Sequence, residues 1–416
     1  MSEQINRYKE AALTIAMGLC RDAIWQEDRC NWLGTSSEDH YGMPRGYAKA
    51  AGNNFYDGTA GIAWFLLHMQ QLHPHARIKK TLFGVLEQLM QEASAKEKTG
   101  DELTGKLGFQ TGWTGMAYVL ERAGELLKEP RYTKAAETLL HKIIKLPAAY
   151  WGLDVIDGAA GAIPALIRMH KKKPNEQLHR FILSLGNYLI EKADKKPSGW
   201  SWNTIHDSTH HLTGYGHGAA GFAAAFAELY AFTGNNDYRQ IVNAVVQYED
   251  SHFISAQQNW PDFRNFNNTV QSSPAEPMCS LAWCHGAPGI GMSRLRIMEL
   301  TGDAGFRKSA EAAVSTTATN LSVMQVGNYS MCHGVFGNAE LLLYAAEILQ
   351  QPDVKKMVTA AAEECISDYI NKKIPVPNGL QSGHETPDFM LGSSGIGYFF
   401  LRLADPEKVQ SMLLLR

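Results

Sequence analysis

The sequence predicts an all-α protein built as a double-layered α/α toroid, with seven inner and seven outer helices. Three observations lead to this prediction. A short glycine motif recurs seven times, and an apolar, helix-like run follows each copy. Longer amphipathic segments alternate with these runs. The first and last units are as apolar as the middle ones, which favours a closed ring over an open solenoid. We therefore expect residues 1–416 to form a single domain.

The repeated motif is a pair of glycines in the spacing G-x-x-G, at intervals of roughly 45 to 70 residues. Glycine lets a chain turn sharply and lets helices approach each other closely. We interpret the pairs as architecture that starts each inner helix, not as phosphate-binding loops. The residues just before each pair are then expected to face the mouth of the ring. The seven pairs are Gly58/Gly61, Gly112/Gly115, Gly158/Gly161, Gly218/Gly221, Gly286/Gly289, Gly334/Gly337 and Gly392/Gly395.

The outer helices are predicted from apolar residues at helical spacing. In 175–191, for example, Leu178, Phe181 and Leu185 fall on one face of a helix whose other face is polar. Little of the chain alternates as a strand does, so a parallel sheet is not expected. The other segments with this pattern are 7–25, 76–94, 132–146, 237–250, 304–320 and 354–370.

Composition excludes several classes of protein. The chain is 45% hydrophobic and 19% charged, which is typical of a globular protein, and its net charge of -3 comes without a basic stripe for nucleic acid. No stretch reaches the ~18 apolar residues of a membrane helix. The polar start MSEQINRYKE does not resemble a secretory signal, so we expect a cytoplasmic protein whose six cysteines are reduced.

The chemistry is expected in repeats five and six, which read Cys284-His285 and Cys332-His333 just before their glycines. Catalytic zinc often has three protein ligands and an open fourth position, and two cysteines with one histidine suit it. Cys332 and His333 are adjacent, so they can converge on one ion from a loop but not from one helical face. The start of a helix also favours the thiolate that binds metal. We expect one Zn²⁺ per chain; the alternative is two buried cysteines beside two core histidines.

At these residues the chain resembles the lanthionine synthetase C-like cyclases. The resemblance runs from FYDGTAGIAWFL to the last helix, and its most specific segments are GYGHGAAG, LAWCHGAPGIG, SMCHGVFGN and GSSGIGYFFLRL. It implies an α/α toroid, a zinc ion and the addition of a peptide cysteine to dehydroalanine or dehydrobutyrine, which makes lanthionine or methyllanthionine. It also implies that Cys284, Cys332 and His333 hold the zinc, and that His217 in YGHG acts with Asp154 in LDVIDG.

The chain departs from the stand-alone cyclases of this family at two positions. They often carry Tyr after the first zinc cysteine and Arg four residues before it, where this chain has His285 and Ser280. The spelling WCHGAPGIG, with NWPDFR upstream, is most similar to the cyclase domain of fused dehydratase–cyclase enzymes. The expected partners are a dehydrated precursor peptide, a separate dehydratase and a membrane export complex.

The expected division of labour follows from chemistry. A free cysteine is only a few per cent thiolate at neutral pH, and zinc coordination deprotonates it. His217 titrates near neutrality and is the candidate general acid/base, oriented by Asp154. His285 either orients the substrate or packs in the core. Trp260 and Arg264, in the long segment 252–282, are predicted to grip the peptide; an ordinary packed loop is the alternative.

Three other functions compete with this hypothesis. A glycoside hydrolase would use two carboxylates among Asp57, Asp154 and Asp157, although Asp57 and Asp157 are more simply helix caps or supporting groups. A zinc-dependent, prenyltransferase-like enzyme would need a lipid pocket and a second subunit. A non-catalytic module that binds glutathione or a protein would keep the zinc without turnover. Bound zinc argues against the first of these.

Overall fold

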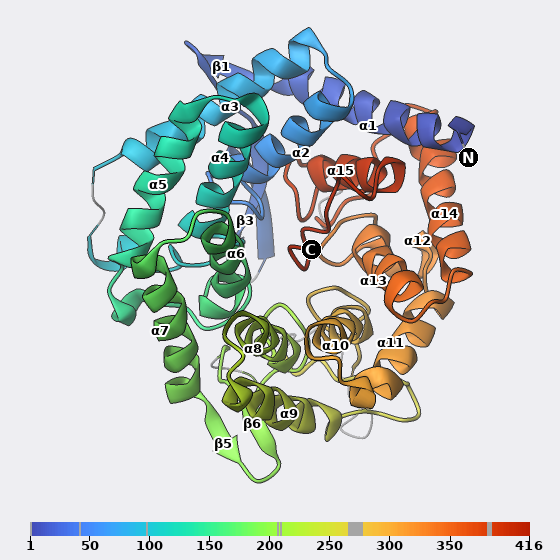
Figure 1. The fold of residues 1–416 in the computed structure, drawn as a ribbon. Helices are drawn as coiled ribbons and strands as arrows, with labels where there is room; N and C mark the ends of the chain where they lie inside the picture. The colour runs from blue at the N-terminus through green and yellow to red at the C-terminus, as the bar shows by residue number, and fades with distance from the viewer. Residues whose placement is uncertain are drawn as a thin grey trace.

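The computed structural model describes residues 2–40, 43–96, 99–205, 208, 210–264, 278–380 and 385–416. It shows the predicted toroid, with an inner ring of helices surrounded by an outer ring (Figure 1). The inner helices are α2 (Thr59–Leu72), α4 (Trp113–Leu127), α6 (Ala159–Lys172), α8 (Ala219–Thr233), α10 (Ala287–Thr301), α13 (Val335–Ile348) and α15 (Ser393–Ala404).

The outer helices lie close to the predicted segments. They are α1 (Ser2–Asp22), α3 (Ala76–Ser94), α5 (Pro130–Ile144), α7 (Glu176–Lys192), α9 (Asn236–Asp250), α11 (Arg307–Thr319) and α14 (Val354–Cys365), the last continued by a π-helical turn, Ile366–Ile370. Short helical pieces add η1 (Gly100–Leu103), η2 (Ala148–Tyr150), η3 (Ala304–Phe306) and α12 (Val323–Val326). No helix in the described ranges is both long and apolar enough to cross a bilayer.

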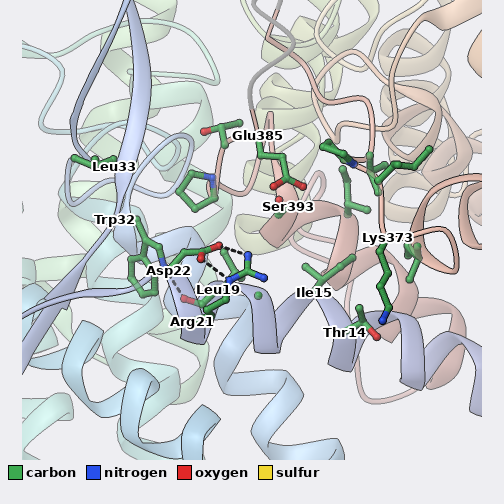
Figure 2. Close-up of a pocket in the computed structure, with 18 of the residues that line it drawn as sticks. Thr14, Ile15, Leu19, Arg21, Asp22, Trp32, Leu33, Lys373, Glu385 and Ser393 are labelled. Atoms are coloured by element: carbon green, nitrogen blue, oxygen red, sulfur yellow. Dashed lines mark hydrogen bonds and ion pairs between the residues drawn. The ribbon is translucent and has the colours of Figure 1, made fainter.

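The ring is closed by its first and last units. The last inner helix, α15, packs against both α1 and α2, and Phe336 of α13 stacks on Phe399 of α15 at 4.3 Å between ring centroids. The indole Nε1 of Trp32 donates to the carbonyl of Leu19 at 2.8 Å, which ties the end of α1 to the strand segment that follows it (Figure 2). The ring is therefore closed by the same apolar packing that joins neighbouring inner helices elsewhere in the toroid.

The sequence analysis did not predict three small antiparallel hairpins. They pair β1 (Ile24–Gln26) with β2 (Arg29–Asn31), β3 (Leu33–His40) with β4 (Met43–Ala50), and β5 (Asp194–Lys196) with β6 (Gly199–Ser201). All three follow an outer helix and precede an inner one. They extend connections of the toroid and leave its two helical layers unchanged.

The glycine pairs have two separate structural tasks. The first glycine of every pair is the residue that precedes the inner helix. The second lies in the first turn, where a β-carbon would overlap the backbone carbonyl oxygen six residues earlier in all seven repeats. The loop therefore folds tightly back over the start of its own helix, and only glycine leaves room for it.

A substitution at one of these second glycines should be costly. In Gly161→Ala the new methyl group would meet the carbonyl of Val155, and we expect the free energy of unfolding to fall by about 1–3 kcal/mol. The matched control is Gly18→Ala in the middle of α1, where the methyl group meets nothing within 4 Å. That variant should gain about 0.5–1 kcal/mol, and denaturant titration measures both changes. Equal stabilities would contradict the steric account.

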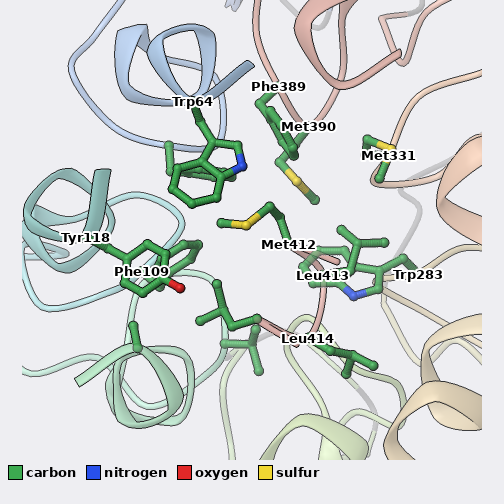
Figure 3. Close-up of a cluster of buried hydrophobic side chains, with 14 of the residues drawn as sticks. Trp64, Phe109, Tyr118, Trp283, Met331, Phe389, Met390, Met412, Leu413 and Leu414 are labelled. Carbon is green, nitrogen blue, oxygen red and sulfur yellow. The ribbon is translucent and has the colours of Figure 1, made fainter. Parts of the chain in front are cut away.

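The same loops fill the centre of the ring. Three residues before each first glycine stands a buried side chain, large and apolar in most repeats: Phe55, Phe109, Val155, Tyr215, Trp283, Met331 and Phe389. The C-terminal segment enters this centre, where Met412, Leu413 and Leu414 complete the cluster (Figure 3). The toroid thus encloses a packed core instead of an open channel.

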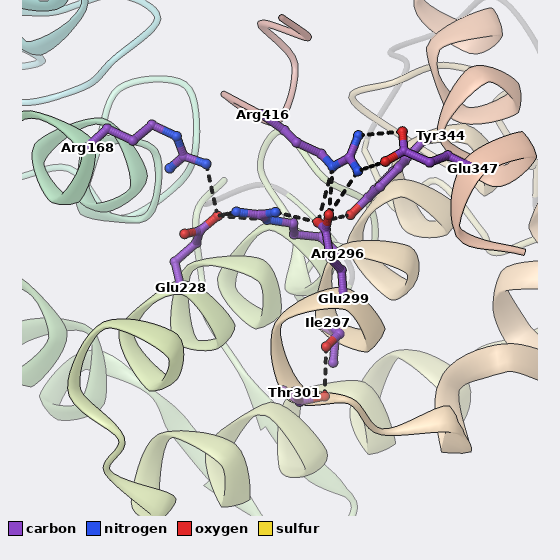
Figure 4. A network of polar contacts seen from close by, with 9 residues as sticks. All are labelled: Arg168, Glu228, Arg296, Ile297, Glu299, Thr301, Tyr344, Glu347 and Arg416. Carbon is purple, nitrogen blue, oxygen red and sulfur yellow. Dashed lines mark hydrogen bonds and ion pairs between the residues drawn. The ribbon is translucent and has the colours of Figure 1, made fainter. Parts of the chain in front are cut away.

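A polar network holds the C-terminal segment in place (Figure 4). Arg416 forms ion pairs with Glu299 of α10 and with Glu347 of α13. The hydroxyl of Tyr344, also in α13, donates to Glu299 at 2.7 Å. Arg296 continues the network from Glu299 to Glu228. These charges lie near the C-terminal ends of inner helices, so the opposite face, where the inner helices begin, is the one that carries the repeat loops.

Candidate active site

The loops that precede the inner helices are joined into a belt by backbone hydrogen bonds. Six of the seven junctions between neighbouring loops are bridged by an N–H that donates to a carbonyl at 2.8–3.2 Å. The bonds are Tyr56 N–Gln110 O, Thr111 N–Ile156 O, Val155 N–Gly216 O, Gly216 N–Cys284 O, Cys332 N–Met390 O and Met390 N–Tyr56 O.

The seventh junction, between the loops of repeats five and six, is different. Among the described residues no backbone hydrogen bond joins these two loops, and the amide of Asn338 instead donates to the carbonyl of Leu281 at 2.9 Å. Cys284 and Cys332 meet at this break with their side chains in hydrogen-bond contact. The two cysteines that the repeat pattern brought to equivalent positions therefore do lie together.

The cysteine pair is buried and electrostatically unequal. The hydrogen bond to Cys332, together with burial, raises the pKa of Cys284 well above its ordinary value. The same hydrogen bond lowers the pKa of Cys332, although burial opposes this. The hydroxyl of Tyr56 also donates to the sulfur of Cys332 at 3.0 Å. The bond from Tyr56 favours the thiolate form of Cys332.

His333 is placed less directly. Its Nε2 lies 2.9 Å from the carbonyl of Gly379 and donates to it in the neutral Nε2–H tautomer, which leaves Nδ1 as the nitrogen available to a ligand. The ring lies close to the thiol of Cys284. Within the described ranges, no three His, Cys, Asp or Glu side chains form a group arranged to hold a metal ion. The structure thus brings two of the three expected ligands together and orients the third by its backbone partner.

His217 and Asp154 form the pair that the resemblance implied. Nδ1 of His217 lies 2.5 Å from Oδ2 of Asp154, so Nε2 is the ring nitrogen left for a substrate. Burial disfavours the charged imidazole, but the hydrogen bond and negative charge of Asp154 outweigh it and raise the pKa of His217. The carboxylate is buried and the histidine half-buried at the loop face. This arrangement suits a group that holds a proton near neutral pH.

The two carboxylate oxygens of Asp154 have different hydrogen-bond partners. Oδ1 accepts from the backbone N–H groups of Ile156 and Asp157 at 2.9 and 3.0 Å, which fixes the turn before α6. The equivalent residues of repeats one and seven, Asn54 and Asp388, make the same bond to the residue three positions on. Only Asp154 adds a histidine partner through its second oxygen. All three residues cap the turn before their inner helix, but among them Asp154 alone also orients an imidazole.

His285 lies next to this pair, fully buried at 1% exposure, with its ring centroid 5.9 Å from that of His217. Burial lowers the pKa of His285 to about 3, so its imidazole is neutral. Neither ring nitrogen has a hydrogen-bond partner within the described part of the chain. Nδ1 lies 3.8 Å from Oδ1 of Asp262, beyond hydrogen-bond distance, so the buried ring is held at a cost beside the carboxylate that fixes Arg264.

Asp262 holds Arg264 beside the cysteines. The guanidinium donates twice to this carboxylate, at 2.9 and 2.6 Å, and the hydroxyl of Ser280 donates to it at 2.7 Å. Burial opposes the charge of Asp262, but these bonds lower its pKa to about 2. The positive charge of Arg264 acts on both Cys284 and Cys332. A cation thus stands near the sulfur pair although the chain has serine at position 280.

The prediction for Trp260 needs correction. Its side chain is only 1% exposed and packs against Phe253 at 4.7 Å between ring centroids. A side chain enclosed in this way has no surface to offer a peptide. Trp260 instead anchors the segment from which Asp262 and Arg264 extend.

Sequence reasoning missed Tyr56 and Asp262. Tyr56 stands two residues before the first glycine of repeat one, the position that Cys284 and Cys332 occupy in repeats five and six. The repeat register alone would have placed it at the same face. Asp262 had no such signal: Arg264 is only two residues away, but Ser280 is 18 residues away and meets this carboxylate only in the folded structure.

Comparison with known proteins identifies the class of protein that this fold and these loops define. The family model described as "Lanthionine synthetase C-like protein" matches residues 49–414, and the chain belongs to that family.

Two relatives illustrate the likeness. The Lacticin 481/lactococcin biosynthesis protein of Lactococcus lactis subsp. lactis is 22% identical over 326 residues, which cover 76% of this chain and 32% of that protein. The chain therefore spans about a third of that relative's length. The solved structure of nisin cyclase superposes with a TM-score of 0.66 at 17% identity, covering 87% of this chain and 92% of the other. At this identity the superposition shows a shared all-α toroid fold.

Proposed function

We propose that the chain is a thioether-forming cyclase that acts on a ribosomally made precursor peptide. It adds a cysteine thiolate of the peptide to dehydroalanine or dehydrobutyrine in the same molecule and so makes lanthionine or methyllanthionine. The observation that carries this proposal is the cysteine pair at the break in the belt, with the His217–Asp154 pair on the same face. Membership in the lanthionine synthetase C-like family supports it.

We propose that Cys284, Cys332 and His333 hold one Zn²⁺ per chain. Two buried sulfurs in contact, one of them also bonded by the hydroxyl of Tyr56, are donors suited to a borderline-soft cation, and Nδ1 of His333 could join them. A bound zinc ion would supply one kind of chemistry here, the deprotonation of a substrate thiol at neutral pH. Three protein ligands would leave a position open for that thiol.

The chain's own residues would then complete the addition. The thiolate sulfur forms a bond to the β-carbon of the dehydro residue, and the electron pair of its C=C bond moves to the α-carbon side. His217, held in its protonated form by Asp154, donates a proton from Nε2 to that carbon. The proton that the thiol released on ionising restores the protonated form of His217. No atom is gained or lost overall, so the reaction is an isomerisation of the peptide.

His285 and Arg264 would orient the peptide during this step. His285 is as buried as Trp260 and would act indirectly, since its Nδ1 lies 3.8 Å from Oδ1 of Asp262, the carboxylate that fixes Arg264. The Arg264 guanidinium, fixed by Asp262, places positive charge where negative charge develops in the transition state. Trp260 supports the segment from its buried position.

The glycoside hydrolase alternative is disfavoured by the same contacts. Its two carboxylates would have to be Asp57 and Asp157, because both oxygens of Asp154 are engaged by His217 and by backbone N–H groups. We further propose that residues 1–416 act as one domain in the cytoplasm, with a separate dehydratase and a membrane export complex as partners.

A thiol count tests the proposed activity directly. Incubated with dehydrated precursor peptides of nisin and of lacticin 481, the zinc-loaded protein should consume free thiols while the peptide mass stays constant. Alkylation of residual thiols followed by mass spectrometry reads both quantities. If the thiols of both peptides persist although the peptides bind, the chain is a binding module and the cyclase proposal fails.

A further inference from the structure

A groove lies at the rim of the toroid, outside the site described above. It is formed by the second half of α1, by Trp32 and Leu33 in the strand segment, by residues 370–376 after α14, and by residues 385–396, which lead into α15 (Figure 2). Its volume is about 670 Å³, within the range of ligand-binding clefts. We call it the rim groove.

The rim groove opens on the face that carries the active-site loops. Ser393, which lines it, is the first residue of the inner helix α15. Leu19 and Trp32 line its other side, and the backbone of Trp32 is bonded to Ala51, next to the loop that starts α2. Because every inner helix begins at the loop face, the groove and the cysteine pair share that face.

Exposed apolar side chains gather in this groove. Ile24, Leu33 and Ile374 all line it and are 52%, 55% and 48% exposed. Only seven large hydrophobic residues are exposed among the described residues, so three of the seven meet at one place. Clustered exposed apolar side chains, unlike single ones, mark a surface that binds something.

Two walls of the groove run directly into the active site. Residues 373–376 form one wall, and three residues further on the carbonyl of Gly379 accepts from His333. Thr386 and Pro387 belong to the other wall, and Met390 just beyond them bonds to the backbone of Cys332. Three extended residues span about 10 Å, so a chain lying in the groove needs only a few more residues to reach the sulfur pair.

We propose that the rim groove binds an extended segment of the precursor peptide that flanks its ring-forming residues, with apolar side chains against Leu33 and Ile374. This inference rests on the proposed function. When the reacting residues of a peptide lie at the loop face, the flanking residues must cross the rim of the toroid. The groove lies at this rim and continues into the site. Lys373 and Glu385, which both line the groove, offer one charge of each sign to the peptide, and Arg21 in the same lining is near enough to interact with Glu385.

A second copy of this chain fits the groove less well. A stable dimer usually buries about 800 Å² on each partner, mostly over a broad surface. The rim groove is concave and presents three exposed apolar side chains with charges between them. That shape and size suit a single extended chain.

Binding of labelled peptides tests the proposal. The probes are fluorescein-labelled, dehydrated precursor peptides of nisin and of lacticin 481, titrated with the full-length protein and followed by fluorescence anisotropy. Leu33→Glu and Ile374→Glu should each weaken binding of at least one probe about tenfold or more, as expected for a buried interface contact. Met324→Glu is the matched control, since Met324 is 91% exposed and does not line the groove.

A short fragment holding one dehydroalanine and one cysteine separates binding from chemistry. The groove variants should cyclise this fragment as fast as the wild type but show a higher KM for the full precursor. Wild-type binding without thiol consumption would defeat the proposed function and leave the groove assignment standing. Three results would each overturn the groove proposal. Both probes could fail to bind, both groove variants could bind as the wild type does, or sedimentation could show a wild-type dimer that dissociates only in these variants.

Discussion

Cys332→Ala should lose bound zinc and cyclisation activity together. Cys332 accepts a hydrogen bond from the hydroxyl of Tyr56, and it stands opposite Cys284 at the junction where no backbone bond joins the described residues of the two loops. Removal of one ligand from a three-ligand zinc site should leave zinc below about a tenth of one equivalent by elemental analysis, since such ligands dominate metal affinity. Cyclisation should fall by a similar factor.

The stability of the same variant gives a second, independent measurement. A metal that joins repeats five and six would replace the missing backbone link, so zinc removal should lower the Tm of the wild type but not that of Cys332→Ala. Cys365→Ala is the control, because Cys365 is a buried cysteine of α14 outside the site. A wild-type protein that is folded, active and free of zinc would contradict the metal assignment.

Much of the fold could be predicted because its cause is local. A glycine at the second position of each pair is required by a carbonyl oxygen only six residues away, so the requirement is visible in any one repeat. All seven inner helices consequently begin at the predicted glycines, and the outer helices follow from apolar spacing alone.

Other features arise only after the ring has closed. Met412, Leu413 and Leu414 read as an ordinary apolar end, and their burial depends on a central space that no single repeat contains. Two of the three hairpins were missed because β1, β2, β5 and β6 have three residues each, too few for an alternating pattern to stand out.

The same distinction between local and long-range causes applies to the candidate site. The repeat register brought Cys284, Cys332 and His217 to one face, since equivalent positions of a toroid point to the same mouth. It said nothing about Asp262, which stands outside the repeat register and meets Ser280, 18 residues away, only in the folded structure. It also could not distinguish an exposed tryptophan from a buried one, which is why Trp260 was assigned to the peptide.

His217→Ala should lose cyclisation rate while keeping both fold and zinc. A general acid/base group typically contributes 10²–10⁴-fold, so kcat should fall by about that factor. KM should change little, because the imidazole is proposed to deliver a proton and not to hold the peptide. Zinc content should match the wild type, since His217 contacts Asp154 through Nδ1 and no cysteine sulfur in the described structure.

Asp154→Asn isolates the charge of the pair from its capping role. Asn54 already caps the equivalent turn of repeat one with its own Oδ1, so asparagine at position 154 should preserve the fold. The pKa of His217 is raised by the charge of Asp154 against the effect of burial, so loss of that charge should lower the pKa. A general acid must be protonated, so the wild-type rate should fall as pH rises through that raised pKa, and the fall should begin at lower pH in Asp154→Asn.

The double variant decides whether the two residues act as a unit. If Asp154 works only by orienting and charging His217, its substitution should cost nothing further once His217 is alanine. Rates measured from pH 5 to 9 on zinc-loaded single and double variants give this comparison. Additive losses would mean that Asp154 acts on the substrate independently. If the His217→Ala protein loses its zinc, His217 is a ligand. If it keeps the full rate, another group supplies the proton, and His285, whose ring centroid lies 5.9 Å from that of His217, is the next candidate.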